Sequence, residues 1–193
     1  MKRVCVFCGA NAGANPAFAD GARALGAALA RRGLGLVYGG GNVGLMGILA
    51  DAALAHGAEV IGVIPEAMVE KELAHRGVTE LRIVRSMHER KATMAELADA
   101  FVALPGGYGT LEEFCEVLTW AQLGLHGKPC GLLNLEGFYD PLLAQIDQAT
   151  QARFIRPEHR ALLVVEGQVG SLLDRLQEAR PPALHKWIDR DQA

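Results

Sequence analysis

Short apolar segments alternate along the chain with stretches in which apolar residues recur every three or four positions. Each apolar segment is four to six residues long, as expected for strands that are buried on both faces of a sheet. Seven strands are predicted, at residues 3–7, 34–38, 59–64, 81–84, 100–104, 129–134 and 161–165. Helices are predicted at residues 16–32, 44–57, 87–100, 110–127, 140–154 and 170–180. This alternation is typical of an α/β domain with a parallel sheet.

The ends of the first helix can be located from the residues that flank it. Asn15 and Pro16 form an N-cap and first-turn pair, and Gly33 follows the helix after two arginines. No linker, repeat or low-complexity segment interrupts the pattern, so we predict one Rossmann-like, doubly wound domain with a mostly parallel sheet over residues 1–180. Residues 181–193 are expected to form a surface extension. Ligands of such sheets bind at the carboxyl ends of the strands.

The length of the chain, its net charge and the lengths of its apolar runs exclude several classes of protein. The chain has 193 residues, enough for one domain with a sizeable core, and its formal net charge is −3. No basic stripe is present, so a nucleic-acid partner has little electrostatic support. The first apolar run has five residues, fewer than the about 7 to 15 of a signal peptide. No run approaches the roughly 20 apolar residues of a membrane span, and we expect a cytoplasmic protein without a membrane partner.

The four cysteines do not suggest a metal site. Cys5 and Cys8 lie three residues apart on a predicted strand, so their side chains should face opposite sides of the sheet. No second C-x-x-C and no paired histidines are available to complete a zinc site. Core packing in a reducing compartment is therefore expected for all four, including Cys115 and Cys130.

Two glycine turns follow predicted strands, and the first is GGGNVG at residues 39–44. It satisfies G-x-G-x-x-G and could cradle a phosphate, or it could simply form a tight turn with close helix–strand packing. The evidence for a dinucleotide is weak because that fingerprint normally belongs to the first strand–helix turn. Glu59 and Glu66 lie at roughly suitable distances for a ribose-binding acid, without a compelling match.

The helix predicted at residues 87–100 carries two cations beside its buried face. Met87, Met94 and Ala98 form one apolar stripe, and Arg90 and Lys91 lie on either side of it. The two cations could point into a cleft to bind an anion. Alternatively, their aliphatic stems could cover the core while their charges reach solvent.

The second glycine turn, PGGYGTLEE, leads directly into a helix. The segment from Thr110 to Glu113 is T-x-x-E, which predicts a capping box. Farther along the helix, Glu112, Glu116 and Thr119 lie opposite the apolar face, with Glu113 between the two faces. If this polar face lined the cleft, its acceptors would lie roughly 5–10 Å from a phosphate on the glycine turn. A carboxylate there could stabilise a ribosyl cation or activate water.

Four motifs together resemble one family: PGGYGTLEE, MHERK, LVYGGGNVGLMG and TWAQLGLHGKPCGLLN. They are similar to the LONELY GUY family of cytokinin riboside 5′-monophosphate phosphoribohydrolases, often labelled lysine decarboxylase-like. The resemblance extends from about Val4 to Phe154. It implies a Rossmann-like fold, a homodimer and no metal or redox cofactor. The implied reaction is hydrolysis of the N-glycosidic bond of N6-modified AMP to the free base and ribose 5-phosphate, with AMP left open as an alternative substrate.

The resemblance also implies roles for individual residues. Arg90 and Glu113 match the positions expected to be catalytic. The implied substrate-binding positions are Glu72, Lys91, Gly106, Gly107, Tyr108, Gly109, Thr110, Leu111, Glu112 and Thr119. The chain departs from the family where FCGSS is often found, because it reads FCGAN. Ala10 offers no hydroxyl group there, although Asn11 could replace part of its hydrogen bonding.

Two other classes of function are compatible with glycine turns on this fold. A non-catalytic nucleotide or molybdenum-cofactor carrier would bind its ligand without turnover. A lysine decarboxylase is disfavoured, because none of the five lysines lies in a recognisable pyridoxal phosphate site. Trp120 and Leu123 are expected to lie in the core or at a dimer surface.

Overall fold

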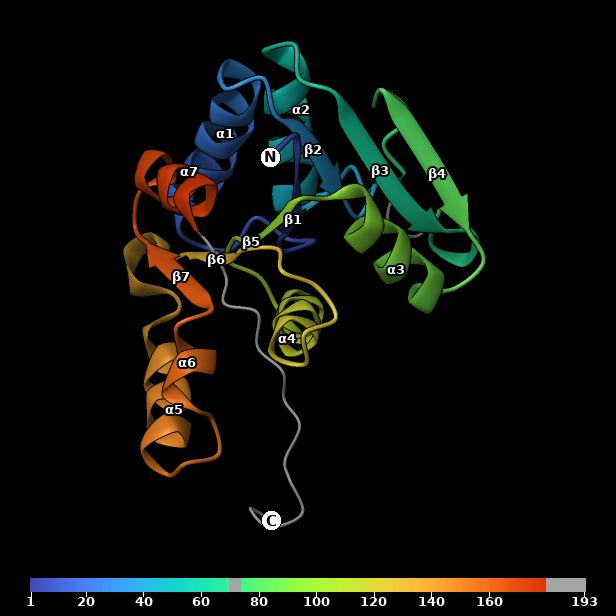
Figure 1. The fold of residues 1–193 in the computed structure, drawn as a ribbon. Helices are drawn as coiled ribbons and strands as arrows, with labels where there is room; N and C mark the ends of the chain where they lie inside the picture. The colour runs from blue at the N-terminus through green and yellow to red at the C-terminus, as the bar shows by residue number, and fades with distance from the viewer. Residues whose placement is uncertain (70–73, 180–193) are drawn as a thin grey trace.

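Seven parallel strands form one sheet in the computed structural model, which describes residues 1–69 and 74–179 (Figure 1). The strand order is β4-β3-β2-β1-β5-β6-β7, and Val4 of β1 lies opposite Leu36 of β2 and Ala100 of β5. All seven strands that the sequence predicts are confirmed: β1 (Arg3–Phe7), β2 (Gly35–Tyr38), β3 (Val60–Pro65), β4 (Glu80–Val84), β5 (Ala100–Ala103), β6 (Cys130–Leu133) and β7 (Leu163–Glu166). The doubly wound α/β fold is therefore confirmed.

Helices cover both faces of the sheet (Figure 1). On one face lie α1 (Pro16–Arg31), α2 (Gly44–Ala55) and α7 (Val169–Glu178). On the other lie α3 (Met87–Leu97), α4 (Tyr108–Gln122) and α5 (Asp140–Gln151). Shorter helical segments are η1 (Glu66–Met68), η2 (Leu135–Gly137) and α6 (Pro157–Arg160). The predicted surface extension at 181–193 lies outside the described residues, so that boundary stays a prediction.

Local sequence explains where α1 begins and ends. The Asn15 side chain accepts a hydrogen bond from the amide of Ala17 at 3.0 Å, and Pro16 occupies the first turn. Arg32 is the C-cap, and Gly33 follows it with φ +66°, a conformation that a residue with a Cβ rarely adopts. Both predicted ends of this helix are confirmed.

The cysteines follow the predicted pattern with one exception. Cys5 packs in the core under α3 and α4, whereas Cys8 packs in the core on the opposite side of the sheet. Cys130 is also buried. The prediction of core packing is wrong for Cys115, because this residue lies on the solvent-facing side of α4 and is exposed.

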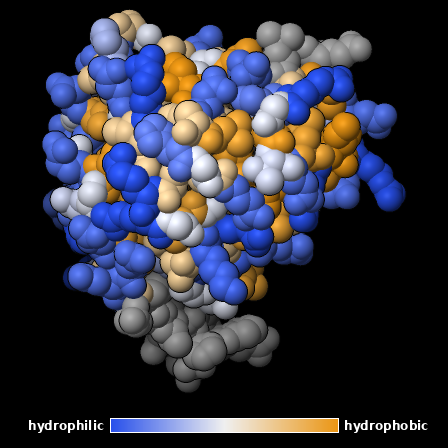
Figure 2. Space-filling model, turned by 90° about the horizontal axis from the view of Figure 1, so that it is seen from above, coloured by the Kyte–Doolittle hydropathy of each residue, from blue (hydrophilic) through white to orange (hydrophobic). Residues whose placement is uncertain are grey.

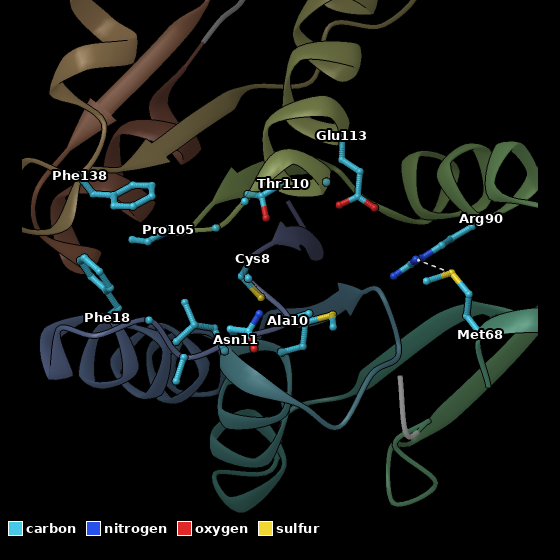
Figure 3. Close-up of a pocket in the computed structure, with 18 of the residues that line it drawn as sticks. Cys8, Ala10, Asn11, Phe18, Met68, Arg90, Pro105, Thr110, Glu113 and Phe138 are labelled. Atoms are coloured by element: carbon cyan, nitrogen blue, oxygen red, sulfur yellow. Dashed lines mark hydrogen bonds between the residues drawn. The ribbon is translucent and has the colours of Figure 1, made fainter. Parts of the chain in front are cut away.

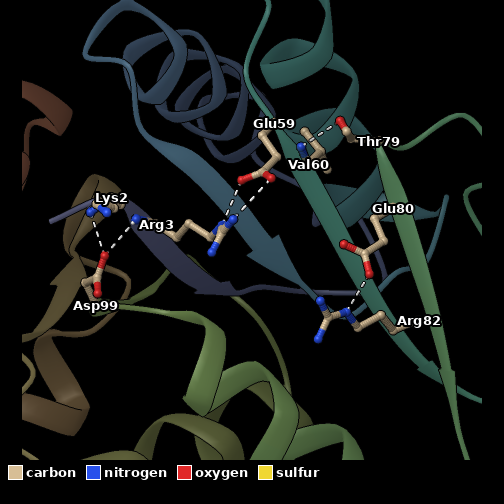
Figure 4. A network of polar contacts seen from close by, with 8 residues as sticks. All are labelled: Lys2, Arg3, Glu59, Val60, Thr79, Glu80, Arg82 and Asp99. Carbon is tan, nitrogen blue, oxygen red and sulfur yellow. Dashed lines mark hydrogen bonds and ion pairs between the residues drawn. The ribbon is translucent and has the colours of Figure 1, made fainter.

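Polar contacts join the strands at the amino-terminal end of the sheet (Figure 4). The Nε of Arg3 lies 2.7 Å from Oε2 of Glu59, and Asp99 accepts a hydrogen bond from the amide of Arg3 at 3.0 Å. The hydrogen bond from Arg3 lowers the pKa of Glu59. Glu59 is thus paired with Arg3 just before β3, at the amino-terminal end of the sheet. A ligand is expected at the opposite, carboxyl end of the strands.

The hydropathy of the surface differs between the two sides of the molecule. Viewed from above, hydrophilic side chains dominate the side of α1 and α7, and hydrophobic ones gather on the side of β4 (Figure 2). Ile83 of β4 is 58% exposed. Across residues 1–69 and 74–179, every helix is too short or too polar to span a bilayer.

Two buried tyrosines provide a matched test of the core. The hydroxyl of Tyr139 donates to the carbonyl of Leu104 at 2.6 Å, whereas the buried hydroxyl of Tyr38 has no partner among the described residues. Tyr139→Phe should therefore lower the free energy of unfolding by about 1 to 3 kcal/mol, because it removes a buried hydrogen bond and leaves the Leu104 carbonyl without this donor. Tyr38→Phe should leave it unchanged or slightly higher. Urea unfolding measures both, and equal losses would contradict this assignment.

Candidate active site

A pocket of about 440 Å³ opens at the carboxyl ends of β1 and β5. Strand β1 lies between β2 on one side and β5 on the other. The order of the strands along the sheet reverses its direction at β1, and the pocket lies at this point. Its volume is within the range of small-molecule sites. The lining comes from the loop after β1, the turn after β5, and helices α1, α2, α3 and α4, with η1 and the segment after η2.

The turn after β5 forms the centre of the pocket wall. Gly106, Gly107, Gly109 and Thr110 line it, as do Gly9 and Asn11 from the opposite loop. The two loops touch, because the amide of Gly9 donates to the carbonyl of Pro105 at 3.1 Å. The first amides of α4 therefore lie at the pocket, where a helix N-terminus favours an anion.

The predicted capping box at Thr110 is wrong. Helix α4 begins at Tyr108 with Gly107 as its N-cap, and no side chain caps it. Thr110 lies inside the first turn and is buried. Side chains do cap α3: Ser86 Oγ accepts from the amide of Glu89 at 3.1 Å, and the Glu89 carboxylate accepts from the amide of Arg85, the residue before the N-cap, at 2.8 Å.

Adjacent glycines in this turn differ in the space around them, which gives a second test. A Cβ on Gly106 would lie 2.1 Å from Oγ1 of Thr110 and 2.9 Å from the amide nitrogen of Gly9. A Cβ on Gly107 would meet nothing within 4 Å. Gly106→Ala should therefore lower the free energy of unfolding by about 1 to 3 kcal/mol. Gly107→Ala should lower it little, and thermal unfolding of the two variants checks the difference; equal midpoints would refute it.

The first glycine turn, at residues 39–44, packs against neighbouring backbone and does not line the pocket. A Cβ on Gly44 would lie 2.3 Å from the carbonyl carbon of Ala10, and Gly44 has φ +55°. The carbonyl of Gly39 accepts a hydrogen bond from Nη2 of Arg90 at 2.9 Å. None of residues 39–44 is among the described residues that line the pocket. The structure therefore favours the packing interpretation of GGGNVG over a phosphate cradle.

Arg90 is a buried cation at one end of the pocket. Its side chain comes from α3 and the residue is 4% exposed. Its Nη1 lies 3.9 Å from Sδ of Met68 and 3.7 Å from Sδ of Met87, both of which line the pocket. Glu113 enters the same end from α4 (Figure 3). Arg90 therefore points into the cleft, as one of the two predicted arrangements requires.

Lys91 points elsewhere. Its Nζ lies 2.6 Å from Oε1 of Glu112 and 3.1 Å from Oε1 of Glu116, so it joins α3 to α4. The hydrogen bond that Lys91 donates to Glu112 is the main cause of the raised pKa of Lys91, and the bond that it donates to Glu116 raises the pKa further, while burial opposes both. The polar face of α4 does not line the cleft, because Glu112, Glu116 and Thr119 are absent from the pocket lining. Glu113, which lies between the polar and apolar faces, does line it.

The remaining predicted residues surround the pocket or lie away from it. Tyr108 is 94% exposed at the start of α4, and Leu111 packs in the core beside it. The hydroxyl of Thr119 donates to the carbonyl of Cys115 at 2.7 Å. None of these three lines the pocket, and Glu72 lies outside the described residues. Their roles in binding stay predictions.

Several lining residues were not predicted from the sequence to belong to the site. They are Cys8, Gly9, Phe18, Leu45, Met46, Met68 and Phe138. The position of Cys8 and Gly9 at the end of a strand was a usable signal. Burial raises the pKa of the Cys8 thiol, so this group stays protonated and is a poor nucleophile. Within the described part of the chain, no three His, Cys, Asp or Glu side chains gather in a way that could hold a metal ion.

Comparisons with known proteins agree on one family. A family model described as "Possible lysine decarboxylase" matches residues 46–176. The cytokinin riboside 5′-monophosphate phosphoribohydrolase LOG1 of Arabidopsis thaliana is 49% identical over 181 residues, covering 94% of this chain and 85% of that protein. The probable cytokinin riboside 5′-monophosphate phosphoribohydrolase LOGL9 of Oryza sativa subsp. japonica is 54% identical, with 94% and 80% covered.

Solved structures share the fold at low identity. The molybdenum cofactor binding protein of Rippkaea orientalis has a TM-score of 0.69 and 22% identity, and 92% of this chain aligns with 97% of that one. The molybdenum cofactor carrier protein of Chlamydomonas reinhardtii also has a TM-score of 0.69, with 20% identity and the same coverage. At this identity the likeness concerns the fold alone.

Proposed function

The chain belongs to the LONELY GUY family of cytokinin riboside 5′-monophosphate phosphoribohydrolases, and on that premise we propose that it hydrolyses the N-glycosidic bond of N6-modified AMP, and of AMP. The products are the free base and ribose 5-phosphate. One observation carries the proposal: Arg90 from α3 lines the same pocket as Glu113 and the glycine turn at the start of α4.

The glycine turn binds the 5′-phosphate in this proposal. Gly107 and Gly109 line the pocket without side chains, and a Cβ on either would meet nothing within 4 Å. A phosphate can therefore approach the backbone amides at the start of α4. Helix α4 has no acidic residue in its first turn, so no carboxylate opposes the anion there.

Glu113 acts on the ribosyl centre, one helical turn beyond the glycine turn. The reaction breaks the bond between C1′ and the base nitrogen, the water oxygen ends on C1′, and a proton ends on the base. A carboxylate beside C1′ stabilises the positive charge that develops there, or accepts a proton from the attacking water.

Arg90 binds the substrate or assists departure of the base. Its guanidinium is positioned by the Gly39 carbonyl, which accepts a hydrogen bond from Nη2. A buried cation stabilises negative charge that develops on the leaving base more strongly than an exposed one would, because water screens it less.

We further infer a cytoplasmic homodimer that binds a small nucleotide. Leu123 and Leu125, after α4, are exposed and supply apolar surface for a second copy. Lys91, Glu112, Tyr108, Leu111 and Thr119 lie in or beside α4, where an approach by a second copy could add them to the binding site. Light scattering in solution measures the mass of the assembly, and a monomer at assay concentration would refute this part.

Decarboxylation of lysine has no support in the pocket. The described lysines are Lys2, Lys91 and Lys128, and none of them lines it. Lys91 is held by two carboxylates, and Nζ of Lys128 donates to the carbonyl of Ala95 at 2.6 Å. A lysine Schiff base with pyridoxal phosphate would need an available amine.

The test compares a nucleotide with the nucleoside that lacks its phosphate. The protein should release base from N6-isopentenyl-AMP and only slowly from N6-isopentenyladenosine, because the phosphate anchors the ribose beside Glu113. Tight binding of the nucleotide without release of base would instead indicate a nucleotide carrier. Equal release from both would show that the glycine turn does not bind a phosphate.

A further inference from the structure

The pocket has two ends of different chemistry, on either side of the glycine turn. Glu113 and Arg90 lie at one end, and Phe18 and Phe138 lie at the other (Figure 3). We propose that Phe18 and Phe138 together form an aromatic wall that restricts the site to nucleoside monophosphates, by closing it beyond the phosphate. This inference rests on the proposed function, since it takes the phosphate to lie on the turn.

The two rings contact each other across the end of the pocket. Their centroids are 5.4 Å apart and their planes meet at 76°, an edge-to-face arrangement. They come from distant parts of the chain, Phe18 from α1 and Phe138 from the segment after η2. The contact therefore joins two separate elements over this end of the cavity.

Each ring is also supported from behind. Phe138 packs edge-to-face on Tyr139 at a centroid distance of 5.0 Å, and the buried Tyr139 is fixed by its hydrogen bond to Leu104. On the other side, a Cβ on Gly13 would lie 2.9 Å from the ring of Phe18, so the backbone there lies close against that ring. The wall is thus set in place by packing and does not depend on a bound ligand.

The position of the catalytic end fixes the direction in which a longer phosphate chain would extend. The ribose must lie toward Glu113, because that carboxylate acts at C1′. Phosphate oxygens that are not bonded to the ribose then face away from Glu113, toward the aromatic wall. A second phosphate would have to occupy the space next to Phe18 and Phe138.

That space is unsuited to a second phosphate. Among the described lining residues, Arg90 and Glu113 carry the only charges, and both lie at the opposite end. A diphosphate would bring further negative charge against two apolar rings, where no cation among the described lining residues compensates for its lost hydration. A monophosphate on the turn does not meet this cost.

The experiment measures kcat/KM for N6-isopentenyl-AMP and N6-isopentenyl-ADP, and the dissociation constants of both by calorimetry. The wild-type chain should favour the monophosphate by about tenfold or more. Phe138→Lys places a cation at the wall and should shift the ratio toward the diphosphate by about tenfold, and Phe18→Ala should shift it in the same direction by opening the wall. Phe154→Ala removes a phenylalanine that is 86% exposed outside the pocket. This control should keep the wild-type ratio, and circular dichroism checks that each variant is folded.

Three results would overturn the inference. The first is a wild-type chain that accepts the diphosphate as well as the monophosphate. The second is a ratio that stays constant in Phe138→Lys and Phe18→Ala. The third is a change in preference between N6-isopentenyl-AMP and AMP instead, which would place the wall against the base. If the wild type released base from neither nucleotide, the proposed function would fail, and the ratio of the two dissociation constants would still decide whether the wall excludes a second phosphate.

Discussion

Replacing Glu113 with Gln is expected to lower kcat by about 10²- to 10⁴-fold, while the fold remains intact. The amide keeps the shape of the side chain but has no negative charge and accepts no proton, so it neither stabilises a ribosyl cation nor activates water. Because Glu113 lines the pocket one turn beyond the proposed phosphate site, KM should change far less than kcat. Steady-state release of base from N6-isopentenyl-AMP measures both constants.

Glu96→Gln is the matched control, because Glu96 lies on the exposed side of α3, outside the pocket lining. This variant should retain wild-type kcat and KM. Near-normal turnover by Glu113→Gln, with the protein folded, would contradict the assignment of Glu113 to catalysis.

The second large effect is expected from Arg90→Lys, which keeps the positive charge but removes the planar guanidinium. A lysine cannot donate to the Gly39 carbonyl and present a second nitrogen to the pocket in the same geometry. We expect kcat/KM to fall by about 10²- to 10³-fold, the usual loss when one preorganised donor is removed. The measurement is the same assay, with the unfolding midpoint recorded in parallel.

A control for this substitution is Arg82→Lys on β4, where an exposed arginine pairs with Glu80. It should leave both activity and stability close to those of the wild type, because exposed ion pairs contribute little. Wild-type kcat/KM in Arg90→Lys would show that charge alone suffices and that the geometry of the guanidinium is not used.

Much of the fold could be predicted because the signals are local. Most strands are short apolar runs, although β4 carries Glu80 and Arg82. The ends of α1 are marked by Asn15, Pro16 and Gly33. The turn at residues 105–110 was recognisable as part of a candidate site because it follows a strand and leads into a helix. Arg90 was recognisable as a candidate site residue because a cation beside the buried face of a helix is unusual.

The contacts between elements could not be predicted in this way. A helical wheel places Lys91 beside a buried face, but it does not show that α4 brings Glu112 and Glu116 to meet it. T-x-x-E at Thr110 has the spacing of a capping box, yet the glycine before Tyr108 starts the helix earlier. Phe18 and Phe138 are 120 positions apart and meet only in the folded chain.

The central claim is that this pocket hydrolyses the N-glycosidic bond of an N6-modified AMP. The most direct measurement is to incubate the purified chain with N6-isopentenyl-AMP and, separately, with AMP, and to quantify free base and ribose 5-phosphate over time. We expect the two products in equal amounts, with their formation abolished in Glu113→Gln. Nucleotide bound by the folded chain with neither product released would contradict the claim.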